Sequence, residues 1–286
     1  MRDDYELLDS GDGRKLERFG KYVLARPCSQ AMWRPALPSS QWRSADASFD
    51  REDGNRWHGR TNLPGEWRIE TAGIRFKLGG TDFGHLGIFP EQRAQWRWIK
   101  DRTSAARPSG LKALNLFAYS GGATLAAAAG GAEVYHVDAS KGMVSWAKEN
   151  AAACKLSDAP VRWLVDDCIK FVQREIRRGN KYDIIIMDPP SYGRGPGGEV
   201  WKLENEVYGF VELCSELLTE DSLMVLINSY TTGLSPSVME YILGETVQKQ
   251  FGGSTTSDEI GIPVSSKPGR VLPCGASAIW LGKGVK

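Results

Sequence analysis

Residues 114–122, Leu-Asn-Leu-Phe-Ala-Tyr-Ser-Gly-Gly, constrain the fold of this chain more than any other segment. The apolar residues 111–116 predict a short strand, the glycine pair predicts a tight loop, and the Ala-rich run that follows predicts a helix ending at Gly130. Glycine lacks a Cβ, so a ligand can approach its backbone closely, and the first N–H groups of a helix have no partner within it. This order of strand, loop and helix is typical of nucleotide-like cofactor sites. The loop taken alone fits an ordinary βαβ turn equally well.

Acidic residues directly follow three further predicted strands: Asp138 after 133–137, Asp166 and Asp167 after 161–165, and Asp188 after 182–187. Ligands of open α/β sheets bind at the carboxyl ends of parallel strands, so these acids are candidates for one site. Asp138 lies about twenty residues beyond the glycine-containing loop, the spacing at which a carboxylate meets ribose hydroxyls. We expect one ligand contact at the end of the strand 161–165, and Asp166 and Asp167 are alternative candidates for it.

The sequence Asp-Pro-Pro-Ser-Tyr at residues 188–192 makes the prediction more specific. Together with Leu-Asn-Leu-Phe-Ala-Tyr-Ser-Gly at 114–121, it resembles the class I S-adenosylmethionine-dependent methyltransferases. The resemblance is strongest to the branch that includes bacterial 23S rRNA large-subunit methyltransferases of the cytosine-5 type, and it covers residues 80–286 approximately. It implies S-adenosyl-L-methionine as cofactor and a Rossmann-like, doubly wound, seven-stranded sheet whose last strand is antiparallel to the others. A dehydrogenase is not expected to carry this motif after its fourth strand.

The 286 residues exceed the usual size of one domain, so we expect an α/β chain with two domains. Residues 1–82 would form a small β-rich domain, and residues 83–286 the methyltransferase domain. The first 110 residues contain 19 Lys and Arg against 15 Asp and Glu, and six of the ten tryptophans. Basic and aromatic residues together can bind nucleic acid, so residues 1–82 are candidates for holding the substrate. A small β domain with Trp in its core and a solvated basic face is an equally good interpretation.

Periodicity and turn residues predict most of the elements. They indicate hairpins within residues 3–26 and 67–78, a fifth strand of the sheet at 222–228, and closing strands at 254–259 and 277–281. Helices are expected at 140–154, 169–178, 207–218 and 235–251, and Ser140 is expected to cap the first of them. Residues 28–65 have weak periodicity, and irregular structure and a partner-binding surface both remain open for them.

The composition indicates a cytoplasmic protein. The amino terminus has no secretory signal, and no apolar run reaches the length of a membrane span. The five cysteines are scattered and contain no Cys-x-x-Cys pair, which argues against disulfides and against a metal site. We expect no membrane partner, no bound metal, and a monomer or homodimer.

The resemblance assigns cofactor binding to Asn115, Phe117, Tyr119, Gly121, Asp138, Ala139, Ser140, Asp167, Cys168 and Asp188. It adds Phe89 and Gln92 as residues of the wall around the cofactor. In this assignment the backbone of residues 117–121 borders the methionine moiety, Asp138 accepts hydrogen bonds from both ribose hydroxyls, and Ala139 packs on adenine. Asp167 accepts from the adenine amino group, and the Cys168 N–H meets a ring nitrogen. Phe89 and Gln92 fit a simple connection between two domains comparably well.

Asp188, Pro189 and Tyr192 are the candidate catalytic residues. Methyl transfer from a sulfonium is an in-line displacement, so the protein mainly aligns donor and acceptor and excludes water. Asp188 and the Pro189 carbonyl would hold an acceptor amino group or ring, and Tyr192 would stack on a base rotated out of its helix. The following residues 193–198, which include Arg194, fit a loop that closes over the substrate or a plain linker.

The chain departs from the cytosine-5 enzymes at one position that decides their chemistry. Methylation at cytosine C5 needs a thiolate that adds to C6. The relatives carry that thiol after the fifth strand, where this chain has Ile227-Asn228-Ser229-Tyr230. Cys274 is the substitute candidate, and a buried structural thiol is the alternative. The RNA-binding module that precedes many relatives is also expected to be absent.

The sequence therefore predicts an S-adenosylmethionine-dependent methyltransferase that acts on RNA, specifically an rRNA base, without a cysteine nucleophile. Two alternatives stay open. One is N- or O-methylation of a protein or small molecule, which needs no thiol. The other is a non-catalytic, cofactor-binding factor in RNA or ribosome assembly.

Overall fold

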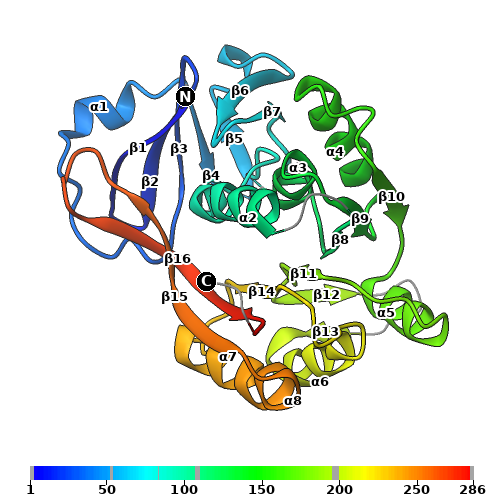
Figure 1. Cartoon of the computed structure of the whole chain (residues 1–286). Coiled ribbons are helices and arrows are strands. Elements are labelled where there is room, and N and C mark those ends of the chain that lie inside the picture. Colours follow the sequence, from blue (N-terminus) through cyan, green and yellow to red (C-terminus); the bar gives the residue numbers. More distant parts are fainter. Residues whose placement is uncertain (1–2, 52–53, 83, 107–109, 195–199, 284–286) are drawn as a thin grey trace. The chain divides into compact units, whose positions relative to one another are not determined.

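The computed structural model describes residues 3–51, 54–82, 84–106, 110–194 and 200–283. The chain is an α/β protein with two compact units (Figure 1). Unit 1 comprises Met1–Ala94 and Gly261–Cys274, and unit 2 comprises Gln95–Ile260 and Gly275–Lys286.

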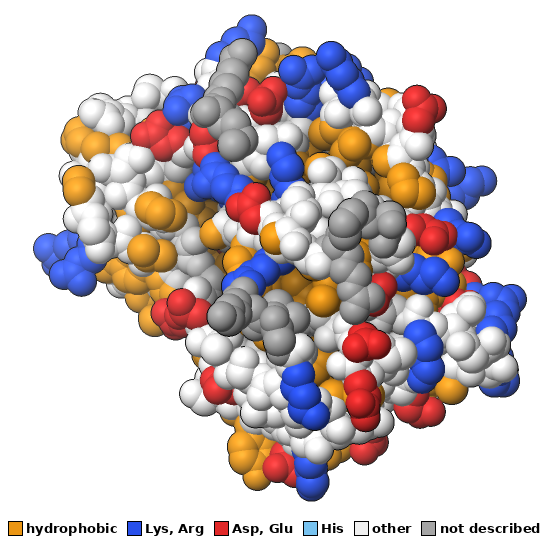
Figure 2. Space-filling model, viewed as in Figure 1, with side chains coloured by type: hydrophobic (Ala, Val, Ile, Leu, Met, Phe, Trp, Pro, Cys, Tyr) orange, Lys and Arg blue, Asp and Glu red, His pale blue; other side chains and the backbone are white. Residues whose placement is uncertain are grey.

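Charges of both signs share the surface. On the face shown in Figure 2, Lys and Arg side chains lie interspersed with Asp and Glu side chains. Within the described ranges, no helix is both long enough and apolar enough to cross a membrane.

Unit 2 is built on a seven-stranded sheet with the strand order β10-β9-β8-β11-β14-β16-β15. The strands are β8 (Lys112–Leu116), β9 (Glu133–Asp138), β10 (Val161–Val165), β11 (Ile184–Met187), β14 (Met224–Ser229), β15 (Ser254–Pro263) and β16 (Val271–Leu281). Strands β10, β9, β8, β11 and β14 pair in parallel, and β16 pairs antiparallel with β14. The predicted doubly wound sheet, including its antiparallel last strand, is confirmed.

Helices cover both faces of this sheet, as Figure 1 shows. One face carries α2 (Arg93–Ala106), α3 (Gly122–Ala129) and α4 (Lys141–Ala153); the other carries α5 (Cys168–Arg177), α6 (Leu203–Ser215), α7 (Pro236–Leu243), η3 (Gly244–Gln248) and α8 (Lys249–Phe251). Alternate strand residues pack into the core under α5 to α8: Leu114, Leu116, Ile185, Met187, Val225, Ile227, Ala278 and Trp280. This period of two is what a strand requires.

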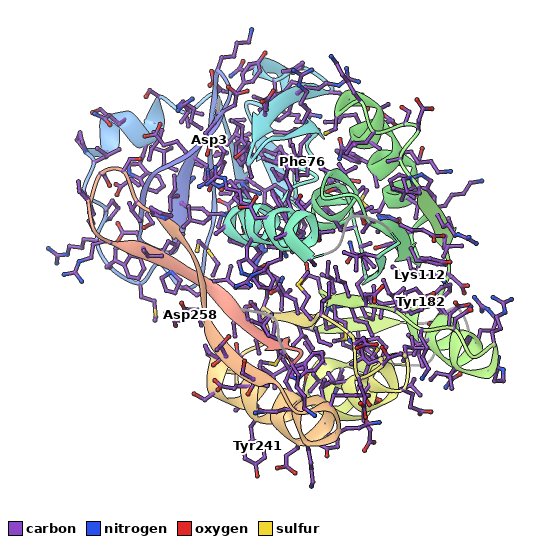
Figure 3. The ribbon with its side chains drawn as sticks, in the orientation of Figure 1. Asp3, Phe76, Lys112, Tyr182, Tyr241 and Asp258 are labelled. Carbon is purple, nitrogen blue, oxygen red and sulfur yellow. The ribbon has the colours of Figure 1, made fainter. Side chains whose placement is uncertain are left out.

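The direction of the strands fixes where a ligand can bind. Lys112 is the first residue of β8, and Tyr182 shortly precedes β11. Both residues are labelled in Figure 3 and mark the amino-terminal edge of the sheet. There the Lys112 N–H donates to the Asp183 carboxylate at 2.8 Å, which ties the two strand starts together. The candidate site residues follow the opposite, carboxyl ends of the same strands.

Unit 1 holds a five-stranded sheet with the order β1-β2-β3-β4-β5. Its strands are β1 (Tyr5–Gly11), β2 (Arg14–Phe19), β3 (Tyr22–Pro27), β4 (Ala47–Asp50) and β5 (Arg56–His58); a separate hairpin consists of β6 (Trp67–Thr71) and β7 (Ile74–Leu78). Both predicted hairpins are confirmed. Short helices complete the unit: α1 (Ser39–Arg43), η1 (Arg60–Asn62) and η2 (Pro90–Gln92). The described part of residues 28–65 is thus partly regular, since it includes α1, β4, β5 and η1.

The tip of the hairpin formed by β15 and β16 belongs to unit 1 because it pairs with β1. Leu7 and Val264 form a parallel bridge, and the Ser265 N–H donates to Leu7 O at 2.9 Å. The Ser266 hydroxyl donates to Asp9 Oδ1 at 2.6 Å. A segment late in the sequence is therefore attached to β1 by an isolated bridge and by backbone and side-chain hydrogen bonds.

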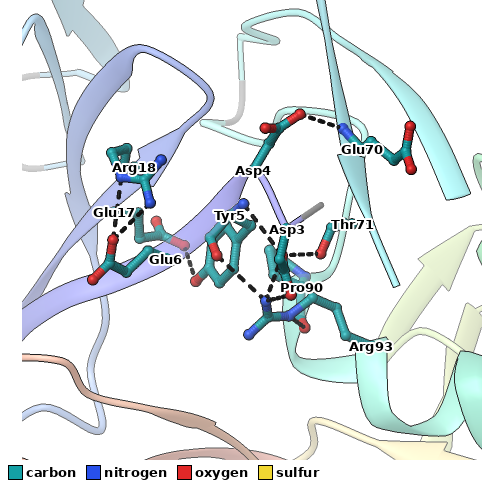
Figure 4. Close-up of polar contacts among 10 residues, drawn as sticks. All are labelled: Asp3, Asp4, Tyr5, Glu6, Glu17, Arg18, Glu70, Thr71, Pro90 and Arg93. Atoms are coloured by element: carbon teal, nitrogen blue, oxygen red, sulfur yellow. Dashed lines mark hydrogen bonds and ion pairs between the residues drawn. The ribbon is translucent and has the colours of Figure 1, made fainter. Parts of the chain in front are cut away.

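A buried ion pair lies inside unit 1. The Glu17 side chain is fully buried and accepts hydrogen bonds from the Tyr5 hydroxyl at 2.9 Å and from Arg26 Nε at 2.8 Å. Burial opposes the charge of Glu17, but the nearby Arg26 and Lys15 outweigh it and hold the pKa of Glu17 below its usual value. Figure 4 shows the Tyr5–Glu17 contact beside the more exposed pair of Arg18 and Glu6.

We expect Arg26→Leu to lower the free energy of unfolding by about 3–5 kcal/mol, because it leaves Glu17 buried without a countercharge. The depressed pKa of Glu17 makes the pair stabilising above the unfolded-state pKa of about 4.3, and this contribution is lost as pH falls through the folded-state pKa. The deficit of the variant should therefore narrow in acid. Urea unfolding at neutral and acid pH measures both effects.

The matched control is Arg18→Leu, which removes a pair whose two side chains are each about one-third exposed. Its cost should stay below about 1 kcal/mol. Equal costs for the two variants would contradict a special role for the buried pair.

Candidate functional site

The loop after β8, residues 117–121, has an unusual backbone. Phe117 and Tyr119 have φ of 56° and 49°, and Gly121 has φ of 89°. Left-handed conformations are uncommon for residues other than glycine and persist where surrounding contacts hold them. Here the Ala118 N–H donates to Val137 O at 3.1 Å, and the Tyr119 N–H donates to Asp138 Oδ2 at 2.8 Å. The loop is thus fixed to the end of β9.

The glycine pair at the end of this loop is required for packing. A Cβ on Gly121 would lie 3.0 Å from Ala147 Cβ, and one on Gly122 would lie 2.5 Å from the Trp96 ring. Helices α4 and α2 therefore occupy the space that the missing side chains leave. Any contact that Gly121 makes with a ligand comes from its backbone.

Asp138 ends β9 and is held by two backbone groups. Its Oδ2 accepts from Tyr119 N and its Oδ1 accepts from Ser140 N, each at 2.8 Å. Burial raises the pKa of Asp138, and these two hydrogen bonds oppose that shift. Each carboxylate oxygen can accept a second hydrogen bond. The half-buried acceptor therefore fits a ligand that offers paired hydroxyl donors, such as a ribose.

Ala139 and Ser140 follow Asp138 and are both exposed. The Ser140 hydroxyl accepts from Met143 N at 3.3 Å, which confirms the predicted cap of α4. Their exposure beside Asp138 leaves room for a flat group such as adenine.

The two acidic residues after β10, Asp166 and Asp167, have different partners. Asp166 forms an ion pair with Arg174 and also accepts from Asp167 N at 2.9 Å. Asp167 caps α5, with Oδ1 accepting from Lys170 N at 2.9 Å. Asp166 is thus committed to a salt bridge. Asp167 is the better candidate for a ligand contact.

Cys168 begins α5, and its thiol is buried against the loop after β8. The Phe117 N–H donates to Cys168 Sγ at 3.2 Å, and burial raises the pKa of this thiol. The side chain therefore supports the loop, and the thiolate form is disfavoured.

Asn115 is the second-last residue of β8 and belongs to a buried hydrogen-bond network. Its amide donates to Thr124 Oγ1 at 2.8 Å, and Thr124 Oγ1 lies 2.9 Å from His136 Nδ1. Burial, with a smaller effect of the Lys148 charge, lowers the pKa of His136 to about 3, so the ring is neutral. This hydrogen-bond network joins β8, β9 and α3 beneath the loop. Sequence reasoning missed Thr124 and His136, which have no local signature.

The segment 188–192 follows β11 beside the loop after β8. The Asp188 N–H donates to Leu116 O at 3.3 Å, and the Asp188 Oδ1 atom is buried. The backbone then reaches β12 (Tyr192–Arg194), which pairs antiparallel with β13 (Val200–Lys202). Tyr192 is 51% exposed. The Arg194 side chain and residues 195–199 of the predicted closing loop lie outside the described part of the chain.

The end of β14 carries the Asn228 amide and the Ser229 hydroxyl, at the position where the resemblance to cytosine-5 enzymes implies a thiol. Asn228 and Gln95 exchange two amide hydrogen bonds of 2.9 and 3.0 Å. Ser229 is buried, and its Oγ accepts from Thr231 N at 3.2 Å. Cys274 belongs to unit 1, where burial raises its pKa.

Phe89 and Gln92 also belong to unit 1. Phe89 directly precedes η2 and Gln92 is its last residue, and the Gln92 N–H donates to Phe89 O at 3.1 Å. Gln92 is buried, and the Phe89 ring lies 5.7 Å from the ring of His85. Their predicted contact with the cofactor stays a prediction.

Comparison with known proteins agrees with this geometry. Residues 21–249 match the family model described as S-adenosylmethionine-dependent methyltransferase. The chain belongs to this family. Its cofactor is accordingly S-adenosylmethionine, and the half-buried acceptor Asp138 at the end of β9 suits the ribose of that molecule.

Individual members of the methyltransferase family show the extent of the likeness. The solved structure of a SAM-dependent methyltransferase from Agrobacterium tumefaciens is 42% identical, with a TM-score of 0.92 over 99% of this chain and 91% of that one. The ribosomal RNA large subunit methyltransferase K/L of Hahella chejuensis is 32% identical over 58% of this chain and 22% of its own length. Its counterpart in Marinobacter nauticus is 29% identical over 70% and 26%. The chain thus spans about a quarter of these curated relatives.

We expect Asp138→Ala to weaken the binding of S-adenosylhomocysteine by about ten- to a hundredfold, because the charge-assisted hydrogen bonds that we predict between Asp138 and the ribose would be lost. Asp158→Ala, which removes an exposed acid from a turn of unit 2, serves as the matched control and should bind normally. Isothermal titration calorimetry measures both affinities, and NAD should not bind. Equal affinities of wild type and Asp138→Ala would remove Asp138 from the site.

Proposed function

We propose that this methyltransferase transfers the methyl group of S-adenosylmethionine to a base of ribosomal RNA. The observation that carries the proposal is the position of the Asp-Pro-Pro-Ser-Tyr segment beside the loop after β8, where Asp188 N donates to the carbonyl of Leu116, the last residue of β8. The names of the curated relatives support the choice of RNA.

The residues around Asp138 would hold the donor. When bound, the cofactor supplies a methyl group activated by its sulfonium. The backbone of residues 117–121 borders the methionine moiety, and Asp138 accepts from the ribose hydroxyls. Asp167 accepts from the adenine amino group, and Ala139 packs on the adenine ring.

The residues after β11 would hold the acceptor. Asp188 and the Pro189 carbonyl accept hydrogen bonds from the target group, and Tyr192 stacks on the flipped base. The half exposure of Tyr192 suits such stacking. In this arrangement the protein contributes alignment and exclusion of water, since the leaving group belongs to the cofactor.

The acceptor is a nitrogen or oxygen atom with its own lone pair. A C5 acceptor would need a thiolate, and the end of β14 offers the Asn228 amide, paired with Gln95, and the Ser229 hydroxyl. A serine alkoxide is far less accessible near neutral pH than a thiolate. The raised pKa of Cys274 argues against thiolate chemistry there.

We also propose that the reaction takes place in the cytoplasm. Residues 1–82 are proposed to help hold the RNA. The support is the composition of the first 110 residues, which contain 19 Lys and Arg against 15 Asp and Glu and six of the ten tryptophans.

The proposal predicts that rRNA from a deletion strain lacks one methylated nucleoside that wild-type rRNA contains. Mass spectrometry of nucleosides from the two strains measures this difference. Re-expression of the wild-type chain should restore the modification, and the Asp138→Ala variant should not. Identical nucleoside profiles in the two strains would refute the rRNA assignment and favour a protein or small-molecule acceptor.

A second prediction concerns the chemistry. RNA that contains 5-fluorocytosine arrests thiol-linked intermediates of cytosine C5 methylation. We expect no stable covalent complex on a denaturing gel after incubation with enzyme and cofactor. A complex that disappears in Cys274→Ala would overturn this prediction and restore a cysteine mechanism.

A further inference from the structure

Trp201, in β13, makes contacts that connect the two halves of the site. Its indole N–H donates to Pro190 O at 2.7 Å. Its ring centroid lies 5.7 Å from that of Phe117 and 5.8 Å from that of Phe210. One side chain therefore contacts the loop after β8 and the segment after β11 at the same time.

The hydrogen bond to Pro190 matters because Pro189 and Pro190 have no N–H groups. At these two residues the backbone can be tied to the rest of the protein only through carbonyl oxygens. The next tie is the Leu203 N–H, which donates to Ser191 O at 3.1 Å. An indole N–H is donor-only and lies on a rigid ring, so it fixes the direction of the carbonyl as well as its position.

The contact with Phe117 reaches the donor side of the site. Phe117 is the first residue after β8, its φ is 56°, and its ring also lies 5.6 Å from Phe210. The Phe117 N–H is held by Cys168 Sγ. The rings of Trp201 and Phe210 thus pack against the side chain of Phe117, a residue whose backbone is strained.

We propose that Trp201 is a positioning residue that sets the spacing between donor and acceptor. This rests on the proposed roles of residues 117–121 and 188–192. Reacting groups must be aligned to within about an ångström, and misplacement by that amount lowers the rate far more than it lowers binding. Loss of the Trp201 hydrogen bond should therefore slow methyl transfer, while the affinity for the cofactor survives.

Two substitutions separate the hydrogen bond from the packing. Trp201→Phe keeps an aromatic ring against Phe117 and removes the donor, whereas Trp201→Ala removes both. The control is Trp98→Phe, a half-buried tryptophan of α2 that lies under Arg102.

For Trp201→Phe we expect S-adenosylhomocysteine affinity within about twofold of wild type, together with about tenfold faster amide exchange at Leu203. Its kcat on unmethylated rRNA from the deletion strain should fall about tenfold or more, with an unchanged KM. Trp201→Ala should in addition lose about tenfold in S-adenosylhomocysteine affinity. Trp98→Phe should match wild type in each measurement.

The inference would be overturned if Trp201→Phe had the kcat and the Leu203 amide exchange rate of the wild type. Ring packing alone would then account for the role of Trp201. A joint fall of cofactor affinity, exchange protection and melting temperature in Trp201→Phe would also overturn it in favour of a purely structural role. If the wild-type enzyme does not methylate rRNA, the proposed function fails. The calorimetry and the amide exchange then still decide whether Trp201 links the two loops.

Discussion

The parallel pairing of β8 with both β9 and β11 is the constraint on which the site depends. In this register Leu116 lies opposite Val137 on one side and opposite Met187 on the other. All three strands therefore end at the same edge of the sheet. The loop after β8, the carboxylate of Asp138 and the Asp188 segment emerge there together, although long stretches of chain separate them.

This edge also stabilises a backbone that would not persist alone. Two non-glycine residues of the loop, Phe117 and Tyr119, have positive φ, at a cost on the order of 1–3 kcal/mol each. Hydrogen bonds to Cys168 Sγ and to the Asp138 carboxylate offset that cost. Because Asp138 holds the loop with the same oxygens that face the ribose in our proposal, loop shape and donor binding are coupled through one side chain.

The proposed chemistry requires rigidity more than it requires a reactive group. Cys168 and Cys214 of unit 2 are buried, and burial raises the pKa of both thiols. The site instead offers carboxylates, carbonyls and aromatic rings held by neighbouring elements. Ser191 illustrates this, since its hydroxyl accepts from Thr231 at 2.6 Å and its carbonyl from Leu203. Such a frame suits a displacement whose leaving group is already activated.

The sequence by itself determined the strand–loop–helix order at 111–130, the acids after the strands, the Ser140 cap and the cofactor family. These follow from short-range patterns: alternation of apolar residues, glycine pairs, caps and an uninterrupted motif. Only the tertiary structure decided that Gly121 makes room for Ala147, that Asp166 is committed to Arg174, and that Trp201 joins Pro190 to Phe117. The glycine and tryptophan contacts join residues far apart in sequence, and the choice between the adjacent Asp166 and Asp167 depends on side-chain directions. Both are set by packing of the folded chain, and no local pattern encodes them.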